Sequence, residues 1–380
     1  MKVLYIIDSF GTGGAEKSLL EITSANSRVN SYFLALHNSK SDITLPENKN
    51  VKIIKLNIPR KTSFSDIVKK VIPYINEFKP DIIHSTLYES DMIARKLKKH
   101  FKIPIINSLV SNSYSAERYA KLNFVDKLKL KYSEYLNRFT ANADMYFSNS
   151  ETIKKSNSKT LKINADKIKV IYRGRDPHKI KDVSLIQIQE LREALNLGDK
   201  KVILNVSRLL KLKGQDELIK AFSIVYKDYP NYVLLIAGEG PFKSQLAKLI
   251  TDLGLEDKVF LLGNRTDIPV LLNIADVFAY PSHVEGLPGA LIEAMFAGKL
   301  IVCSDIPENQ ECVTNKEATF FRKGNIQEMS EILANALKGD KSFEQKKEIA
   351  RETAFQKFDI ASIANQYYDT YKEIISNYKN

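Results

Sequence analysis

The strongest constraint on the fold is the alternation of short apolar runs with amphipathic stretches, which occurs in both halves of the chain. Alternation of this kind indicates parallel sheets connected by crossover helices. Both halves are therefore expected to be α/β. The runs expected to be strands are Val3–Ile7, Ser31–Leu36, Val51–Leu56, Asp81–His84, Ile103–Ser108 and Asp144–Ser148 in the first half, and Lys201–Val206, Tyr232–Ala237, Val259–Leu262, Val277–Tyr280 and Leu300–Cys303 in the second.

The length of 380 residues is enough for two such domains, each with its own buried core. We expect an α/β protein of two Rossmann-like, doubly wound domains that face a central cleft. The candidate linker is the segment 174–184, which contains Pro177 and many charges. The first domain is predicted to span residues 1–176 and the second residues 177–359. A closing helix at about residues 360–380 carries tyrosines that could pack back on the first domain.

The composition argues against several classes of protein. No run of about 18 apolar residues occurs, so a membrane-spanning helix is not expected. The first residues become charged too soon for a signal peptide. The two cysteines, Cys303 and Cys312, cannot form a disulfide framework, which favours a reducing cytoplasm. The five histidines are scattered along the chain, so neither a metal site nor a bound cofactor is predicted.

Basic residues are concentrated in the first half of the chain. Residues 1–175 contain 31 Lys or Arg and 16 Asp or Glu, whereas the whole chain contains 57 and 45. The net charge of +12 therefore belongs entirely to the first half. Such asymmetry favours an anionic partner, either a membrane surface or a nucleic acid.

Two glutamates, Glu285 and Glu293, form the most informative local feature. The run before them, Asp276–Tyr280, is predicted to be a buried strand, and the stretch Pro288–Ala297 a helix. Glu285 is therefore expected in the strand-to-helix loop and Glu293 about one turn inside the helix. The backbone N–H groups of Gly286–Gly289, between them, would suit an anion or the hydroxyls of a polar ligand. A capped loop followed by a solvated glutamate is the alternative interpretation.

Three more loops follow predicted strands of the second half. Arg208 and Lys213 come after Lys201–Val206, where two fixed cations can neutralise a diphosphate. The next strand ends in a glycine turn that contains Gly240, and the one after it is followed by Asn264 and Arg265. Taken singly, each of these is explained by surface charge or an ordinary turn. Because ligands bind at the carboxyl ends of strands in open α/β sheets, the loops together predict a nucleotide site.

A glycine-rich loop, Phe10–Glu16, follows the first predicted strand and opens the first helix. Its glycines, including Gly13 and Gly14, would let a phosphate or a sugar approach the backbone closely. The dinucleotide-binding fingerprint requires a third glycine where this chain has Glu16, so the loop does not match that pattern. Contact with a ligand and a purely structural turn both remain open.

Together these motifs resemble those of the family 4 glycosyltransferases, a large group of retaining enzymes with the two-domain GT-B fold. The resemblance implies a metal-independent hexosyltransferase that moves a hexose or N-acetylhexosamine from a nucleotide sugar to a glycan or lipid-linked saccharide. The resemblance further implies a role in the synthesis of cell-surface polysaccharides or glycoconjugates. The matching residues are Gly13-Gly14-Ala15-Glu16, Arg208 with Lys213, Gly238-Glu239-Gly240-Pro241, Glu285 with Glu293, and Glu293–Gly298.

The resemblance also implies a role for each matching residue. The first domain would bind the acceptor and the second the nucleotide sugar. Glu293 would hold the ribose hydroxyls, and Glu285 the hydroxyls of the donor sugar. Arg208 and Lys213 would stabilise the departing diphosphate, so they and Glu285 are the predicted catalytic residues. The other predicted donor-binding residues are Gly13, Gly14, Gly240, Asn264, Arg265, Gly286, Leu287, Pro288 and Gly289.

The chain departs from the family pattern in two places. Many members have a histidine just after the strand that corresponds to Ile103–Ser108, but none occurs here near Val110. The segment Tyr172–Pro177 stands where an Asn-Gly-Val-Asp type of sequence is common. Its arginines, Arg173 and Arg175, could reach the expected cleft or form a structural hinge. The motifs do not specify the acceptor site; the candidates are Tyr114, Arg118 and Arg173.

Residues Glu117–Phe139 are predicted to form one helix in which bases and apolar residues are mixed. Such a helix could seat a cytoplasmic protein on the anionic inner face of the plasma membrane, where an undecaprenyl-diphosphate-linked acceptor would be found. The alternative is an ordinary helix with its apolar side in the core and its lysines in water.

Two other functions are compatible with parts of the sequence. One is a nucleotide-sugar epimerase or a phosphorylase of the same fold. The other is a nucleic-acid-binding protein that uses the basic half. The chain contains no recognisable nucleic-acid recognition module, so nucleic acid is not the expected partner. A nucleotide-sugar donor is expected instead.

Overall fold

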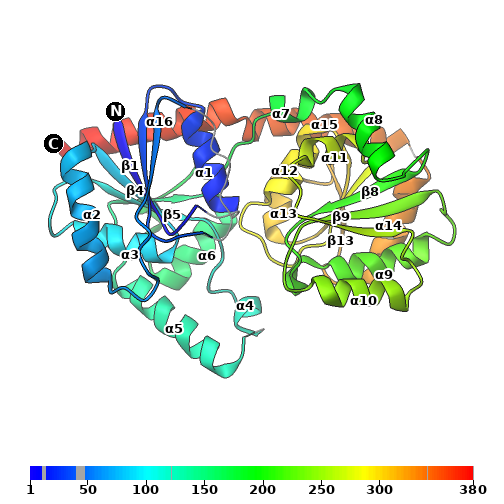
Figure 1. The fold of residues 1–380 in the computed structure, drawn as a ribbon, viewed down its shortest axis with the longest axis horizontal. Coiled ribbons are helices and arrows are strands. Elements are labelled where there is room, and N and C mark those ends of the chain that lie inside the picture. The colour runs from blue at the N-terminus through cyan, green and yellow to red at the C-terminus, as the bar shows by residue number, and fades with distance from the viewer. Residues whose placement is uncertain (11–13, 40–47, 121, 340, 380) are drawn as a thin grey trace. The chain divides into compact units, whose positions relative to one another are not determined.

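The computed structural model describes residues 1–10, 14–39, 48–120, 122–339 and 341–379. They form two compact units: unit 1 consists of Met1–Gly174 with Ile360–Asn380, and unit 2 of Arg175–Asp359. Each unit has its own parallel sheet with helices on both faces (Figure 1). The predicted architecture of two doubly wound α/β domains is therefore confirmed. The chain leaves unit 1 after Gly174 rather than after residue 176.

Unit 1 is built on a seven-stranded sheet in the order β3-β2-β1-β4-β5-β6-β7. The chain builds outward from β1 in one direction and from β4 in the other, so the switch point of this sheet lies between β1 and β4. The short last strand was not predicted. The strands are β1 (Lys2–Ile7), β2 (Asn30–Ala35), β3 (Val51–Lys55), β4 (Ile82–Thr86), β5 (Ile105–Leu109), β6 (Met145–Ser148) and β7 (Ile168–Val170).

Alternate side chains of β1 lie in two hydrophobic cores, one on each face of the sheet. Leu4 and Ile6 lie in a core with residues of α2 and α3, whereas Tyr5 and Ile7 lie in a core with residues of α1 and α16. This is the period of two expected when both faces of a strand are covered. The helices of unit 1 are α1 (Gly14–Ser24), α2 (Phe64–Phe78), α3 (Tyr88–Leu97), α4 (Ala116–Ala120), α5 (Phe124–Phe139), α6 (Glu151–Leu161) and α16 (Ile360–Lys379), with a 3₁₀ turn η1 at Ala165–Lys167.

The closing helix α16 packs on unit 1 through buried polar aromatic groups. The Tyr371 hydroxyl lies 2.5 Å from His84 Nδ1 on β4 and 3.2 Å from the Tyr5 hydroxyl on β1. His84 Nε2 lies 2.7 Å from Ser108 Oγ on β5. All of these groups are buried. Because a buried polar group is costly without a partner, this network specifies where α16 docks.

The prediction of one continuous helix at Glu117–Phe139 is wrong. The segment forms two helices, α4 and α5, and the second begins after Asn123. The Asn123 side chain accepts a hydrogen bond of 2.9 Å from the Asp126 N–H, which is the geometry of an N-cap. An asparagine in this position starts a new helix instead of continuing the previous one.

Unit 2 is built on a six-stranded sheet in the order β10-β9-β8-β11-β12-β13, so its switch point lies between β8 and β11. Its strand pairs are parallel. The last, three-residue strand was not predicted. The strands are β8 (Lys201–Val206), β9 (Tyr232–Ala237), β10 (Val259–Gly263), β11 (Val277–Tyr280), β12 (Leu300–Ser304) and β13 (Thr319–Phe321).

The helices of unit 2 begin within the expected linker, where α7 follows Pro177. No helix in the described part of the chain is both long and apolar enough to cross a bilayer. The helices are α7 (His178–Lys181), α8 (Leu185–Ala194), α9 (Gln215–Val225), α10 (Lys243–Asp252), α11 (Ile268–Ile274), α12 (Gly289–Phe296), α13 (Pro307–Cys312), α14 (Ile326–Leu337) and α15 (Lys341–Phe358), with a 3₁₀ turn η2 at Lys211–Lys213.

Candidate functional site

The loops at the switch point of unit 2 carry the three predicted catalytic side chains. Arg208 and Lys213 follow β8, and Glu285 follows β11, the neighbouring strand. Parallel strands place their carboxyl ends on the same edge of the sheet. The crevice outside a switch point is the usual place for ligands in open α/β sheets.

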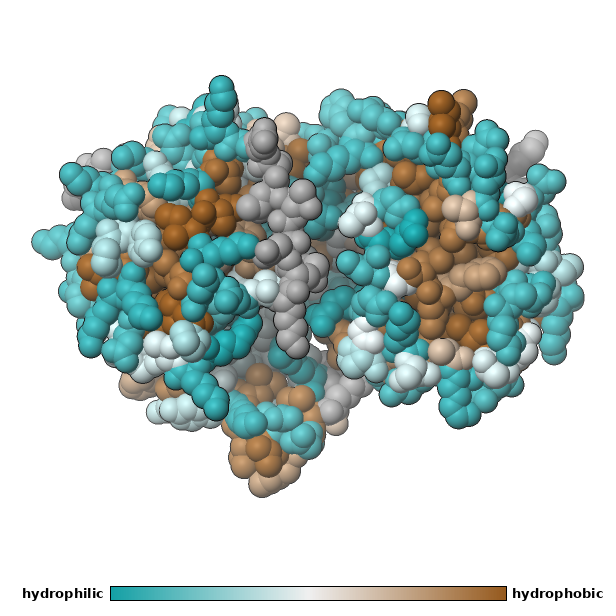
Figure 2. All heavy atoms as spheres, viewed as in Figure 1, coloured by the Kyte–Doolittle hydropathy of each residue, from teal (hydrophilic) through white to brown (hydrophobic). Residues whose placement is uncertain are grey.

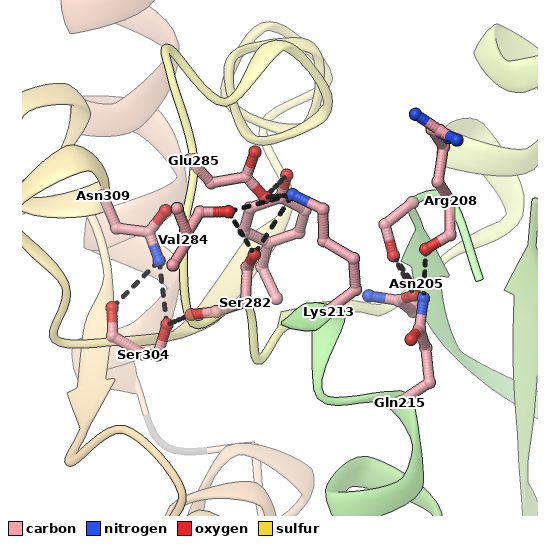
Figure 3. A network of polar contacts seen from close by, with 11 residues as sticks. Asn205, Arg208, Lys213, Gln215, Ser282, Val284, Glu285, Ser304 and Asn309 are labelled. Atoms are coloured by element: carbon pink, nitrogen blue, oxygen red, sulfur yellow. Dashed lines mark hydrogen bonds and ion pairs between the residues drawn. The ribbon is translucent and has the colours of Figure 1, made fainter. Parts of the chain in front are cut away.

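Lys213 and Glu285 form a direct ion pair at this edge. Lys213 Nζ lies 2.5 Å from Glu285 Oε1 and also donates to the Val284 carbonyl at 3.0 Å (Figure 3). The Tyr280 hydroxyl donates to the same carboxylate oxygen at 2.7 Å. Burial, followed by the Glu285 charge, raises the pKa of Tyr280 well above its ordinary value, so it remains a donor. Among the described residues no hydrogen bond to Glu285 Oε2 is recorded, which leaves acceptor capacity on this carboxylate.

Close backbone packing brings this lysine to its glutamate. Gly214, which follows η2, has a φ of +67°, and a Cβ there would lie 2.3 Å from the Pro281 carbonyl oxygen. A side chain at position 214 would therefore push the β8 loop away from the β11 loop. The two loops are also joined by a hydrogen bond of 2.8 Å from the His283 N–H to the Leu212 carbonyl.

Arg208 presents its guanidinium without a partner among the residues that the structure describes. Its carbonyl accepts a hydrogen bond of 2.9 Å from Gln215 Nε2, which also donates to Ser207 Oγ at 2.8 Å. The Arg208 side chain is exposed and extends away from this network (Figure 3). No hydrogen bond or ion pair of its guanidinium with the described residues is recorded. The backbone of Arg208 is therefore held in place, while the charge of its guanidinium remains available to a ligand.

Glu293 lies inside α12 and pairs with Arg175, the first residue of unit 2. Arg175 Nε donates to Glu293 Oε1 at 2.8 Å, and the two side chains are 15% and 23% exposed. The guanidinium also lies directly against the start of α12, because a Cβ at Gly289 would be 1.9 Å from Arg175 Nη2. The sequence led us to expect that Arg175 reaches a ligand or forms a hinge, but not that it pairs with Glu293, since the two positions are far apart in the sequence.

The loop between Glu285 and α12 offers backbone donors. The first N–H groups of a helix have no acceptor inside it, and α12 begins at Gly289. Among the described residues no backbone acceptor is recorded for the N–H groups of Gly286, Leu287 or Gly289. Pro288, between them, has no N–H to contribute. The segment combines open donors with the positive end of a helix, as an anion site requires.

The other two loops of unit 2 serve partly to pack the backbone. A Cβ at Gly240 would lie 2.2 Å from the Leu209 carbonyl oxygen, so this glycine permits close contact with the β8 loop. Asn264 is exposed after β10. Arg265 is paired with Asp267. Its charge is therefore less available than that of Arg208.

In unit 1 the glycine loop is only partly described. Gly13 lies outside the described residues, and Gly14 is the exposed first residue of α1. Arg173 is buried, and its Nη1 donates to the Ala15 carbonyl at 2.7 Å. Burial raises the pKa of Glu16, and the nearby Arg173 opposes that shift. The contacts of Arg173 are those of a residue that supports the start of α1.

The remaining acceptor candidates lie near α4 and α5. Tyr114 is partly buried, and its hydroxyl accepts from Asn137 Nδ2 at 3.2 Å. It lines a hollow of about 510 Å³ with Tyr119, Glu134 and Arg138. Arg118 is exposed on α4 and does not line this hollow. His84 is enclosed by the aromatic network under α16, so it does not replace the missing family histidine.

The sequence interpretation missed a polar cluster at the switch point of unit 1. Asp8, directly after β1, accepts hydrogen bonds from the N–H of Ser90 at 2.9 Å and from its hydroxyl at 2.6 Å. His37 Nε2 lies 3.0 Å from Glu89 Oε2 at the same edge. Burial raises the pKa of Asp8. The signal was an aspartate at the carboxyl end of the first strand, where a charged residue would not be needed for the core.

No group of three or more His, Cys, Asp or Glu side chains that could hold a metal ion occurs within the described ranges. Both cysteines are buried thiols in unit 2.

Two family models match the chain. The model described as Glycosyltransferase Family 4 matches residues 12–179, and the model described as Glycosyl transferases group 1 matches residues 187–353. Between them they cover most of unit 1 and of unit 2.

Individual relatives agree with these matches. An uncharacterized glycosyltransferase of Methanocaldococcus jannaschii is 29% identical over 62% of this chain, and the match covers 58% of that protein, less than two thirds of its length. The N-acetylgalactosamine-N,N'-diacetylbacillosaminyl-diphospho-undecaprenol 4-alpha-N-acetylgalactosaminyltransferase of Campylobacter jejuni is 26% identical over 96% of this chain and 99% of its own. The crystal structure of Anabaena HepE in complex with UDP and glucose has the same fold, with a TM-score of 0.83 and 24% identity over 98% of this chain and all of that one.

Proposed function

Because this chain belongs to the family 4, group 1 glycosyltransferases with the GT-B fold, we propose that it transfers a hexose or N-acetylhexosamine from a nucleotide diphosphate to a lipid-linked saccharide, with retention at the anomeric carbon. A role in cell-surface polysaccharide or glycoconjugate synthesis follows from such an acceptor. Unit 2 is assigned the donor and unit 1 the acceptor. The reaction would take place at the inner face of the plasma membrane.

The arrangement of charge at the switch point of unit 2 carries this proposal. A guanidinium, an ammonium and the open N–H groups before α12 lie on one edge of the sheet, together with two carboxylates. Cations and N–H donors suit a diphosphate, whereas carboxylates suit the hydroxyls of a ribose and a sugar. A nucleotide sugar has these chemical groups in one molecule.

In the proposed reaction the bond between the sugar anomeric carbon and the diphosphate oxygen breaks while the acceptor oxygen bonds to the same face of that carbon. The departing phosphate oxygen takes the proton of the acceptor hydroxyl. Arg208 and Lys213 stabilise the negative charge that grows on the diphosphate. Glu285 orients the sugar through its hydroxyls, and Glu293 holds the ribose. No protein carboxylate acts as a nucleophile.

The two ion pairs describe the state of the site before the donor binds. Lys213 is compensated by Glu285, and Glu293 by Arg175, so each partly buried charge has a partner before binding. A donor can use the second oxygen of Glu285 without breaking its lysine contact. We expect Lys213 to shift toward the phosphate as charge develops there.

The relatives support the choice of donor and acceptor class. HepE was crystallised with UDP and glucose, and the Campylobacter enzyme is named for a sugar acceptor on diphospho-undecaprenol.

A thermal-shift panel of UDP-, GDP-, ADP- and dTDP-sugars tests the donor assignment, because a ligand that binds only the folded state raises its melting temperature. The stabilising donor is then incubated with undecaprenyl-diphosphate-linked saccharides, and the anomeric configuration of the product is read by NMR. We expect release of the nucleoside diphosphate and a retained configuration. No stabilisation by any member of the panel, or an inverted product, would contradict the proposal.

A further inference from the structure

The outer face of α5 is an exposed apolar stripe. Six of the eleven large apolar side chains recorded as exposed in the described part of the chain lie on this one helix, each 52–79% exposed. They form the brown area at the lower edge of unit 1 in Figure 2, at the position of α5 in Figure 1. The stripe consists of Phe124, Val125, Leu128, Tyr132, Tyr135 and Phe139.

The stripe is continuous and has basic edges. With 3.6 residues per turn, its six residues fall within an arc of about 100° on the helix surface. Lys127, Lys131 and Arg138 follow one edge of that arc, and Lys129 lies beyond the other. Three of these bases, Lys129, Lys131 and Arg138, are exposed.

The opposite face of α5 attaches the helix to unit 1 through polar contacts. Asn137, the one residue of α5 classed as buried, accepts a hydrogen bond of 2.7 Å from Arg95 Nη1 through its side-chain oxygen. Glu134 accepts from the Tyr119 hydroxyl at 2.5 Å. The usual order of an amphipathic surface helix is thus reversed, with polar groups inward and aromatic groups outward. The ordinary-helix interpretation, which placed its apolar side in the core, is wrong for α5.

We propose that α5 docks on an anionic phospholipid surface, lying flat with the stripe among the acyl chains and the bases among the headgroups. Sixteen residues in a helix span about 24 Å, and an apolar face edged by Lys and Arg is typical of an interfacial helix. The positive charge of the first half of the chain attracts the same surface. This inference rests on the proposed function, since the lipid-linked acceptor would be reached at such a surface.

A second copy of the chain fits the stripe less well. Pairing two α5 helices through their stripes would bring the basic edges of one beside those of the other, and like charges at short distance are unfavourable. An anionic lipid surface satisfies both the apolar centre and the basic edges.

Fluorescence offers a direct test because the chain contains no tryptophan. Tyr132→Trp places a single reporter in the stripe, and Ile186→Trp, at an exposed apolar position on α8 of unit 2, serves as the matched control. Vesicles of phosphatidylcholine, with or without phosphatidylglycerol, are added to each. We expect a blue shift for the reporter at position 132 with anionic vesicles and none for the control. A reporter at 132 that stays at its aqueous wavelength would overturn the proposal.

Flotation with the same vesicles separates the contribution of the apolar stripe from that of its basic edges. Leu128→Ser with Tyr132→Ser removes the centre of the stripe, and Lys131→Gln with Arg138→Gln weakens one basic edge; each should lower vesicle binding about tenfold or more. Leu185→Ser with Ile186→Ser on α8 should bind as wild type, and Lys69→Gln with Lys70→Gln on α2, which removes the same charge away from α5, should lower binding far less. Vesicle binding by the stripe variant equal to that of wild type would contradict the assignment to α5. A loss of binding in the control variants as large as in the stripe variant would contradict it as well.

Two further measurements keep this inference distinct from the proposed function. Light scattering reports the oligomeric state, and a dimer that the stripe variant converts to a monomer, without vesicle binding, would assign the stripe to a second copy and overturn the lipid proposal. Nucleotide-sugar binding in the absence of vesicles should be the same in the stripe variant and wild type. If vesicles bind and no nucleotide sugar does, the membrane inference stands while the proposed reaction fails.

Discussion

Arg175 Nε donates to Glu293 Oε1 at 2.8 Å, so the first residue of unit 2 is tied to the carboxylate proposed to hold the donor ribose. Both side chains are mostly shielded from water. The arginine also lies against Gly289 at the start of α12. The pair therefore connects the entry of the chain into unit 2 with the helix that bears the site.

Arg175→Ala should lower the stability of unit 2 by about 1–3 kcal/mol, because it leaves a partly buried carboxylate without its cation. Glu293→Gln, which retains the shape of the side chain, should cost less. A double-mutant cycle on the melting transition measures their coupling. If the stability losses of the two single variants simply add in the double variant, the pair contributes nothing to the stability of unit 2.

Lys213→Ala should reduce turnover by about 10²–10³-fold, since it removes a cation that stabilises the leaving diphosphate. Arg208→Ala should act in the same way, with little change in melting temperature, because its guanidinium is exposed. The matched control is Lys211→Ala, which removes a neighbouring exposed base that is paired with Asp216. Initial rates at saturating donor check this prediction, and a Lys211 variant as slow as the Lys213 variant would contradict the assignment.

Tyr371→Phe should lower the stability of unit 1 by about 1–3 kcal/mol and loosen α16. The change deletes the hydroxyl that lies 2.5 Å from His84 Nδ1 and leaves a buried ring nitrogen without that partner. Tyr368→Phe is the control, because that tyrosine is only partly buried and its recorded ring contacts are with Arg28 and Lys372. Limited proteolysis near α16, together with the melting temperature, reports the outcome. Equal protease resistance of the Tyr371 variant and wild type would argue against this account of docking.

The buried His84 should make stability depend on pH. Burial, with a smaller effect of Arg173, lowers its pKa to about 3 in the folded state, against about 6.5 in an unfolded chain. The unfolded state therefore binds the proton first as the pH falls. The stability associated with a neutral His84 is complete above about pH 6.5 and is lost at about 1.4 kcal/mol per pH unit below it.

His84→Gln isolates this effect. The stability advantage of wild type over the variant should shrink as the pH is lowered from about 8 to about 5. Asp91, whose pKa burial raises to about 7, contributes the opposite slope, but it is present in both proteins and cancels in the comparison. Melting temperatures of the two proteins across this range provide the check. A difference that stays constant with pH would mean that His84 is not held neutral.

Much of the fold could be predicted because the central strands of each sheet, such as β1, β8 and β9, are runs of mostly apolar residues that are buried on both faces. The strands β8, β9 and β11 begin and end where their runs do. The three-residue strands β7 and β13 were not predicted, because so short a segment has no detectable hydrophobic periodicity. The break at Asn123 was missed because the apolar pattern continues across it, while a single side chain caps the new helix.

The candidate site was predictable to a lesser extent. Glycine turns and charges after predicted strands located the loops, since parallel strands share an edge at their carboxyl ends. The Arg175–Glu293 pair and the Asp8–Ser90 contact could not be deduced, because each joins residues far apart in the sequence through tertiary packing. The outward orientation of the α5 stripe was also hidden, because hydrophobic spacing shows that a helix has an apolar face but not what that face meets.

Calorimetric titration of the stabilising nucleotide sugar into wild type, Glu293→Gln and Glu331→Gln tests the central claim most directly. Glu293 is proposed to hold the ribose, whereas Glu331 lies exposed on α14. Loss of hydrogen bonds to a charged group should weaken binding about 10- to 100-fold in the Glu293 variant and leave the Glu331 variant unchanged. Wild-type affinity in the Glu293 variant would contradict the claim that this edge of unit 2 binds the donor.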